Sequence, residues 1–198
     1  DRIEVAYSGY DPEEIGAITP GNDAVRRKFG IGPDTPLIVT SGQFIERKGC
    51  WTVLESLRHL RANGSEFVFL WLGTSTADAS VLKRIEDFGL GTSFRLLTPD
   101  EIGPTRHDVL TLVAGADIFV LASTQEGLPI SLVEAMALGR PCIATRIGAI
   151  PEAIEDGKNG ILIEPNDPVG LSAAINDLIR NDQKRESIGA AAVSSARV

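Results

Sequence analysis

The sequence contains few of the residues that mark several classes of protein. Its 198 residues include two cysteines, one methionine and 6% aromatic residues, and 19 Lys and Arg stand against 27 Asp and Glu. Cys50 and Cys142 lack metal-ligand spacing, so we expect two reduced thiols rather than a disulfide or a metal site. The formal net charge of −8 would repel a polyanion, and no basic patch offsets it. Nucleic acid is therefore excluded as a partner.

Long hydrophobic runs are also absent. No apolar run reaches the roughly 18–20 residues that span a bilayer, and the sequence shows no signal peptide. The composition, 43% hydrophobic and 23% charged, is that of a globular protein, and a chain of this length can bury a sizeable core. We expect a cytoplasmic, globular α/β protein.

The two ends of the chain predict a fragment of a longer protein. Met136 is the only methionine, so the chain does not begin with an initiator, and residues 190–198 look like a helix cut short. Residues 1–35 are interpreted as a connector from a missing N-terminal domain. In that connector we expect a strand or linker over 2–6, then a loop with one short helix over 7–35.

Strand and helix signals alternate through residues 36–198, which predicts one doubly wound parallel sheet of the Rossmann-like type. The predicted strands are 37–40, 67–72, 94–97, 118–122, 141–145 and 160–163. The predicted helices are 50–62, 81–88, 105–113, one from residue 129, 151–155, 168–179 and one from about residue 182. In the common strand order 3-2-1-4-5-6, the loops after strands 1 and 4 meet where the winding reverses, which is where ligands bind.

The loop after the first strand carries two adjacent cations. Gly42 and Gly49 flank it, and Arg47 and Lys48 lie near its end. It lacks the Gly-Lys-Ser/Thr ending of a Walker phosphate loop. We interpret the cations as neutralising a diphosphate held at the helix start near Gly127; the alternative is that they are solvated loop charges.

The loop after the fourth strand carries two acids around a helix start. Glu126 precedes Gly127, Pro129 suits the first helical position, and Glu134 lies in the helix. Free N–H groups at a helix start bind anions, so acids beside them favour a ligand with both phosphates and hydroxyls, such as a sugar nucleotide. Two alternatives remain: Glu126 caps the helix, or Glu134 points to solvent rather than to ligand hydroxyls.

These motifs together resemble a known family. The segments are Glu126 to Glu134 (a Glu-x7-Glu pattern), 139–141, 147–152, 156–162 and the loop from Gly42 to Gly49. In combination they resemble the retaining GT-B glycosyltransferases of group 1 (family 4), over most of residues 37–180. The resemblance implies the C-terminal, donor-binding half of a GT-B fold.

The resemblance also implies roles for individual residues. Glu126 resembles the acid that contacts the donor sugar, Glu134 the acid that holds the ribose, and Lys48 the lysine on the diphosphate, with Glu126 and Lys48 expected to be catalytic. The N–H groups of Leu128 and Ile130 fall where the phosphates meet the helix. The donor-binding residues are then expected to be Gly42, Gln43, Arg47, Lys48, Thr98, Glu126, Gly127, Leu128, Pro129, Ile130 and Glu134.

Two positions depart from the family pattern. Gln43 stands where many members have arginine, which puts one phosphate contact in doubt unless Arg47 compensates. Ala149 stands where many have a second glycine after Gly148. Thr98, after the third strand, is expected near the base.

The expected partners are a nucleoside-diphosphate sugar, the missing N-terminal domain and a sugar, lipid or polysaccharide acceptor. The resemblance implies transfer with retention, with no metal or other cofactor, and no Asp-x-Asp motif is present. It allows for peripheral membrane association of the full-length protein, and the fragment alone is expected to be inactive. The alternatives are a nucleotide-sugar epimerase of the GT-B fold and a non-catalytic nucleotide-binding module. His107 is expected at the surface rather than as a base, and Trp51 and Trp71 in the core.

Overall fold

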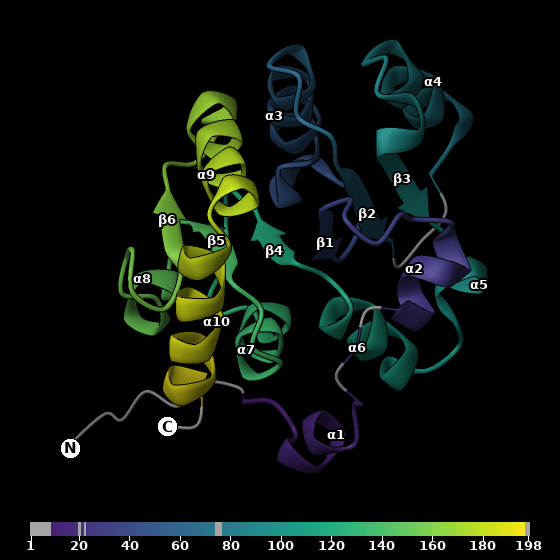
Figure 1. The fold of residues 1–198 in the computed structure, drawn as a ribbon. Helices are drawn as coiled ribbons and strands as arrows, with labels where there is room; N and C mark the ends of the chain where they lie inside the picture. Colours follow the sequence, from purple (N-terminus) through teal and green to yellow (C-terminus); the bar gives the residue numbers. More distant parts are fainter. Residues whose placement is uncertain (1–8, 20, 22, 74–76, 197–198) are drawn as a thin grey trace, which may run out of the picture.

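The protein forms one six-stranded parallel sheet with helices on both faces (Figure 1). The computed structural model describes residues 9–19, 21, 23–73 and 77–196. The strands are β1 (Leu37–Ser41), β2 (Val68–Leu72), β3 (Phe94–Leu97), β4 (Ile118–Leu121), β5 (Cys142–Thr145) and β6 (Ile161–Ile163). Their order is β3-β2-β1-β4-β5-β6. The predicted topology is confirmed, and β1 and β4 are neighbours.

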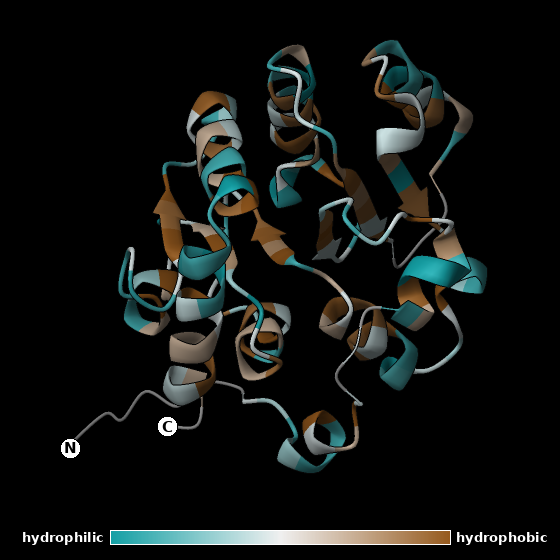
Figure 2. Ribbon diagram, in the orientation of Figure 1, coloured by the Kyte–Doolittle hydropathy of each residue, from teal (hydrophilic) through white to brown (hydrophobic). Residues whose placement is uncertain are grey.

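The helices that connect the strands are α3 (Cys50–Ala62), α4 (Ala79–Asp87), α5 (Pro99–Ile102), α6 (Arg106–Ala114), α7 (Ile130–Ala137) and α8 (Ile150–Ala153). Two more helices, α9 (Pro168–Arg180) and α10 (Asp182–Ala196), follow the last strand. One face of the sheet packs on α3, α4 and α9, and the other on α6, α7, α8 and α10. Most strand residues are buried, and Figure 2 shows the strands mostly in the hydrophobic colour, with a hydrophilic band in β3. Burial on both faces explains their continuous apolar runs.

The N-terminal segment contains two short helices where the sequence predicted one. They are α1 (Pro12–Gly16) and α2 (Asp23–Phe29). Ile18 packs with Leu110 and Ala114 of α6, and Val25 joins the main core. The segment is thus attached to the α/β domain. The strand or linker expected over 2–6 lies outside the described residues, and the continuation into a preceding domain stays a prediction.

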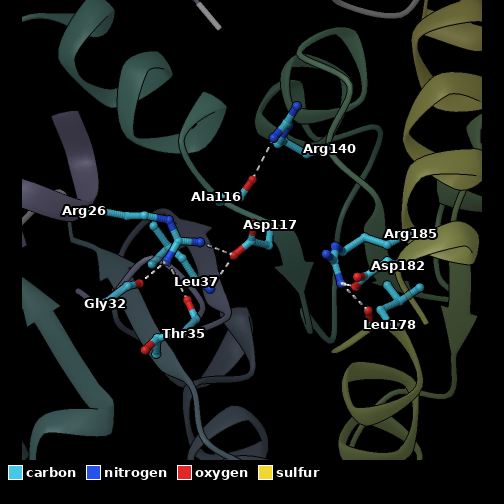
Figure 3. A network of polar contacts seen from close by, with 10 residues as sticks. All are labelled: Arg26, Gly32, Thr35, Leu37, Ala116, Asp117, Arg140, Leu178, Asp182 and Arg185. Carbon is cyan, nitrogen blue, oxygen red and sulfur yellow. Dashed lines mark hydrogen bonds and ion pairs between the residues drawn. The ribbon is translucent and has the colours of Figure 1, made fainter. Parts of the chain in front are cut away.

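The amino ends of β1 and β4 are held by a network around a buried arginine (Figure 3). The Arg26 guanidinium donates to the carbonyls of Gly32 and Thr35 and lies 2.7 Å from the Asp117 carboxylate. The same carboxylate oxygen accepts the N–H of Leu37 at 2.7 Å. Interactions between the chain's own groups therefore hold this edge of the sheet together, beside a depression of about 310 Å³ that Arg26 and Asp117 help to line.

Within the described residues no helix is long and apolar enough to cross a membrane.

Three short elements differ from the prediction. The four-residue helix α5 and the 3₁₀ turns Glu46–Lys48 and Gly91–Ser93 were not predicted. These elements are too short to show a helical repeat of apolar residues.

Candidate functional site

The loops after β1 and β4 meet at the carboxyl edge of the sheet. The loop after β1 begins at Gly42, whose N–H donates to the carbonyl of Leu72 and whose carbonyl accepts the indole N–H of Trp71 at 2.9 Å. Trp71 is buried, as expected of a core residue. It also fixes the start of this loop, a role that the sequence did not reveal.

The two loops are joined by backbone contacts. The N–H of Thr124 donates to the carbonyl of Arg47 at 2.8 Å. Gly49 has a φ of +73°, and a Cβ there would lie 1.9 Å from the carbonyl oxygen of Ala122. Only glycine fits both the backbone angle and the close approach. The geometry of the turn that carries Arg47 and Lys48 therefore depends on direct contact with the loop after β4.

Lys48 and Glu126 form an ion pair where the loops meet. The Lys48 ammonium lies 2.5 Å from Glu126 Oε1, and the side chains are 18% and 10% exposed. Arg47 lies 3.9 Å from the same oxygen and donates to the carbonyl of Gln125. The predicted convergence of the two loops is confirmed. The solvated-charge alternative is wrong for Lys48, whereas Arg47 is about half exposed.

The start of α7 differs in register from the prediction. Helix α7 begins at Ile130, and Pro129 is its N-cap residue with extended backbone rather than the first helical residue. The reason is that the Pro129 carbonyl already accepts the N–H groups of Leu132 and Val133. No side chain caps this helix, so the capping alternative for Glu126 is wrong. The first N–H groups of α7 remain unpaired within the helix.

An open depression of about 370 Å³ lies beside these groups. Its lining is Arg47, Gln125, Glu126 and Gly127. Gly127 has no atom within 4 Å of where a Cβ would stand. The protein itself leaves this space free, so the depression brings together a cation and a carboxylate, a few residues before the uncapped start of α7.

The loop after β5 packs against the backbone of Glu126 and Gly127, which line the depression. Gly148 has a φ of +50°, and a Cβ there would stand 2.1 Å from the carbonyl oxygen of Glu126. The N–H of Ala149 donates to the Gly127 carbonyl at 3.3 Å. Gly148 is thus the glycine that this contact needs, and Ala149 fits beside it.

Glu134 lies inside α7 and is buried. Its exposed fraction is 8%, so the alternative that it points to solvent is wrong. The guanidinium of Arg106, in the first turn of α6, contacts its Oε1. The Nε of Arg106 also lies 2.7 Å from the Glu14 carboxylate. Sequence reasoning missed Arg106, since nothing in its own segment signals a partner on another helix.

Helix α5 follows directly after β3. Thr98 is the N-cap, and its N–H and hydroxyl donate to the Glu101 carboxylate. The hydrogen bond from the Thr98 N–H lowers the pKa of the Glu101 carboxyl, and the hydrogen bond from the Thr98 hydroxyl adds a smaller effect. Partial burial of Glu101 opposes this shift. Gln43 is exposed on the loop after β1. The position of Thr98 at a carboxyl strand end matches the prediction, and its proposed closeness to a base stays a prediction.

The remaining candidates behave as expected, with one exception. His107 is exposed on α6, and both cysteines are free and buried. Burial raises the pKa of the Cys50 thiol to about 11 and raises that of Cys142 further. The exception is Trp51, which was expected in the core. It is only half-buried, and the guanidinium of Arg84 stacks on its ring.

Metal ligands do not cluster in the described part of the chain: no group of three or more His, Cys, Asp or Glu side chains could hold an ion there. The expectation that no metal or cofactor is needed is not tested by this observation and stays a prediction.

The family is shown by comparison with known proteins. The model for "Glycosyl transferases group 1" matches residues 21–194. The chain belongs to this family. It is 29% identical over 205 residues to the D-inositol 3-phosphate glycosyltransferase of Corynebacterium jeikeium, covering 98% of this chain and 47% of that protein.

Solved structures show the same fold. The chain is similar to Anabaena HepE in complex with UDP-glucose, with a TM-score of 0.80 and 23% identity, over 98% of this chain and 52% of that chain. It is similar to the C-terminal domain of the group 1 protein LpcC from Francisella tularensis, with a TM-score of 0.76 and 23% identity, over 92% and 95% of the two chains. The fold is thus a Rossmann-like C-terminal domain of the GT-B type. The chain spans about half the length of the relatives of full size.

Proposed function

We propose that this chain is the donor-binding domain of a retaining glycosyltransferase of family 4 and binds a nucleoside-diphosphate sugar. The observation that carries the proposal is the Lys48–Glu126 ion pair beside the uncapped start of α7. These groups line or adjoin one open depression at the topological switch point, between β1 and β4. This is the position where doubly wound sheets bind ligands.

The diphosphate is assigned to the cations and the helix start. Lys48 and Arg47 supply positive charge, and the N–H of Ile130 and the dipole of α7 add favourable interactions with an anion. Lys48 already neutralises Glu126, so a phosphate entering here meets a charge-balanced pair rather than a bare carboxylate. Leu128 and Pro129 belong to the same turn and place the helix start.

The hydroxyl groups are assigned to the two acids. Glu126 would accept hydrogen bonds from the donor sugar, and Glu134, one turn into α7, from the ribose. Gly42, Gln43, Gly127 and Thr98 would complete the donor site, with Thr98 near the base. Solved complexes of similar fold contain UDP or UDP-glucose, which supports a nucleotide sugar as the ligand.

The chemistry follows from where negative charge grows. As the glycosidic bond to the leaving phosphate breaks, the diphosphate gains charge, and preorganised donors at Lys48 and α7 stabilise it. The sugar is transferred with retention to a sugar, lipid or polysaccharide acceptor. A preceding N-terminal domain would hold that acceptor, and no metal or cofactor is assigned a role. We place the reaction in the cytoplasm, with peripheral membrane association of the full-length protein left open.

A screen with nucleotides tests the binding. UDP, GDP and ADP are added to the chain, and its melting temperature is followed; a ligand of the folded state raises it by mass action. We expect one of the three nucleotides to raise the melting temperature strongly. The corresponding free nucleoside should raise it only weakly. If none of the three raises the melting temperature, the proposal is contradicted.

Product analysis with the full-length protein then separates transfer from the alternatives. A glycosylated acceptor supports transfer, a sugar isomer identifies an epimerase, and nucleotide binding without either product identifies a binding module. The fragment alone is expected to be inactive, and transfer by it would contradict the role given to the N-terminal domain.

A further inference from the structure

Arg106 connects two acids from distant parts of the chain. Its Nε lies 2.7 Å from Glu14 of α1, and its terminal nitrogen contacts Oε1 of Glu134 in α7. Helices α6 and α7 pack against each other, and Ile15 of α1 packs against α6, below which α1 is drawn in Figure 1. The guanidinium therefore occupies one side of the Glu134 carboxylate.

The position of Arg106 is unusual for its helix. A cation in the first turn of a helix opposes the helix dipole, and this end of α6 is already capped by Thr105 and Asp108. Arg106 is 48% exposed, while the Glu134 side chain is 11% exposed. The two acids, rather than α6 itself, account for where the guanidinium lies.

Glu134 has no other partner among the described residues. Its Oε1 is fully buried and accepts no hydrogen bond of regular geometry, so Arg106 is its sole neighbour of opposite charge there. A buried carboxylate needs a partner. Two adjacent ribose hydroxyls that bind both oxygens of this carboxylate would take the place of the guanidinium at Oε1.

We propose that Arg106 is a built-in competitor for the ribose hydroxyls and so determines how tightly the site holds a nucleotide. This inference rests on the proposed function, which assigns the ribose to Glu134. When a nucleoside diphosphate binds, Arg106 leaves Glu134 and remains at Glu14, which its exposure permits. The competition weakens retention of the nucleoside diphosphate that transfer leaves behind, and product release limits the rate of many enzymes.

Calorimetric titration of the Arg106→Ala variant tests the competition, with UDP, 2′,3′-dideoxy-UDP and pyrophosphate as probes. We expect UDP to bind about threefold to tenfold more tightly than to the wild type, the range for an ion pair with one half-exposed partner. Dideoxy-UDP and pyrophosphate, which have no hydroxyls for Glu134, should keep their wild-type affinities. GDP or ADP, with its dideoxy form, replaces UDP if the screen selects it.

Three further variants keep the result unambiguous. Arg106→Gln should change affinity with the same sign as Arg106→Ala, which provides a second measurement if the alanine variant folds poorly. In the Glu134→Gln background, Arg106→Ala should no longer tighten UDP binding. Arg58→Ala removes an exposed arginine paired with Glu55 on α3 and should leave all three affinities unchanged.

Weaker UDP binding in Arg106→Ala overturns the proposal, because it would show that Arg106 holds Glu134 in place for the ligand. An equal change for UDP and dideoxy-UDP overturns it as well. A wild-type chain that binds none of the nucleoside diphosphates and no pyrophosphate contradicts the proposed function itself. Wild-type binding with unchanged affinity in Arg106→Ala contradicts this inference alone.

Discussion

The two edges of the sheet use charged pairs in different ways. At the amino edge, Asp117 accepts from Arg26 and from the N–H of Leu37, and Arg26 donates to two loop carbonyls. At the carboxyl edge, Lys48 and Glu126 pair beside an open depression, and the buried Oε1 of Glu134 accepts no regular hydrogen bond. At the amino edge, backbone groups as well as side chains satisfy the charges, although a depression of about 310 Å³ adjoins Arg26 and Asp117. At the carboxyl edge, the described partners of the Glu126 and Glu134 carboxylates are side chains alone, which a ligand can displace.

The largest expected effect is on stability and concerns the amino edge. Arg26→Met removes one partner of a largely buried pair and leaves Asp117 without the cation that contacts it, so we expect the free energy of unfolding to fall by about 3 kcal/mol. Urea titration measures this change. The folded variant should bind UDP with wild-type affinity.

Arg58→Ala is the matched control for an exposed pair. Because Arg58 is exposed and Glu55 is partly exposed on α3, loss of the Arg58 side chain should change stability by less than about 1 kcal/mol. If Arg26→Met weakened UDP binding while remaining folded, the separation between the two edges would be wrong.

The next effect concerns the contact between the loops that follow β1 and β4. Gly49→Ala places a Cβ 1.9 Å from the Ala122 carbonyl oxygen at a φ of +73°. We expect a loss of more than about 2 kcal/mol in stability, since the backbone angle alone costs about 1–2 kcal/mol, together with weaker UDP binding.

Gly64→Ala isolates the contribution of the backbone angle. Gly64 has a φ of +77° but no atom within 4 Å of a Cβ, so its substitution should show the smaller cost and normal UDP binding. Equal losses in the two variants would mean that the contact with Ala122 does not fix the loop.

Lys48→Ala should affect binding more than stability. The diphosphate loses a cation and meets an unneutralised Glu126, so we expect UDP affinity to fall about tenfold to a hundredfold, with the affinity of uridine unchanged. Calorimetry with both ligands measures the difference. Equal losses for nucleotide and nucleoside would remove Lys48 from the phosphate site.

The smallest of these effects is expected for Glu134→Gln. The amide retains one acceptor oxygen, so UDP affinity should fall only about fivefold, and pyrophosphate affinity should be unchanged. Titration of both ligands gives the comparison. A similar loss for pyrophosphate would show that Glu134 supports the helix start rather than the ribose.

Much of the fold could be predicted from the sequence because the strands are buried on both faces. Runs such as 67–72 and 118–122 are apolar throughout, and alternation with helical patterns restricts the topology. The convergence of Lys48 and Glu126 followed from this topology, because loops after neighbouring parallel strands share one edge. The helix predicted from residue 105 also forms, and Thr105 and Asp108 close its first turn as a capping box.

The errors occurred where the decisive interaction is short or distant in sequence. The Asp11-Pro12 and Thr98-Pro99 pairs begin helices of only five and four residues, too short for a periodic pattern. The register at Pro129 depends on which carbonyl the first helical N–H groups reach. The partner of Glu134 lies 28 positions earlier on another helix, so its position follows from packing and not from local sequence.

The most direct test of the central claim is the position of the diphosphate in a crystal structure of this chain with the nucleotide that the screen selects. The account predicts phosphate oxygens within hydrogen-bond distance of Lys48 Nζ and of the N–H of Ile130. A nucleotide bound elsewhere, with the depression beside Glu126 empty, would contradict it.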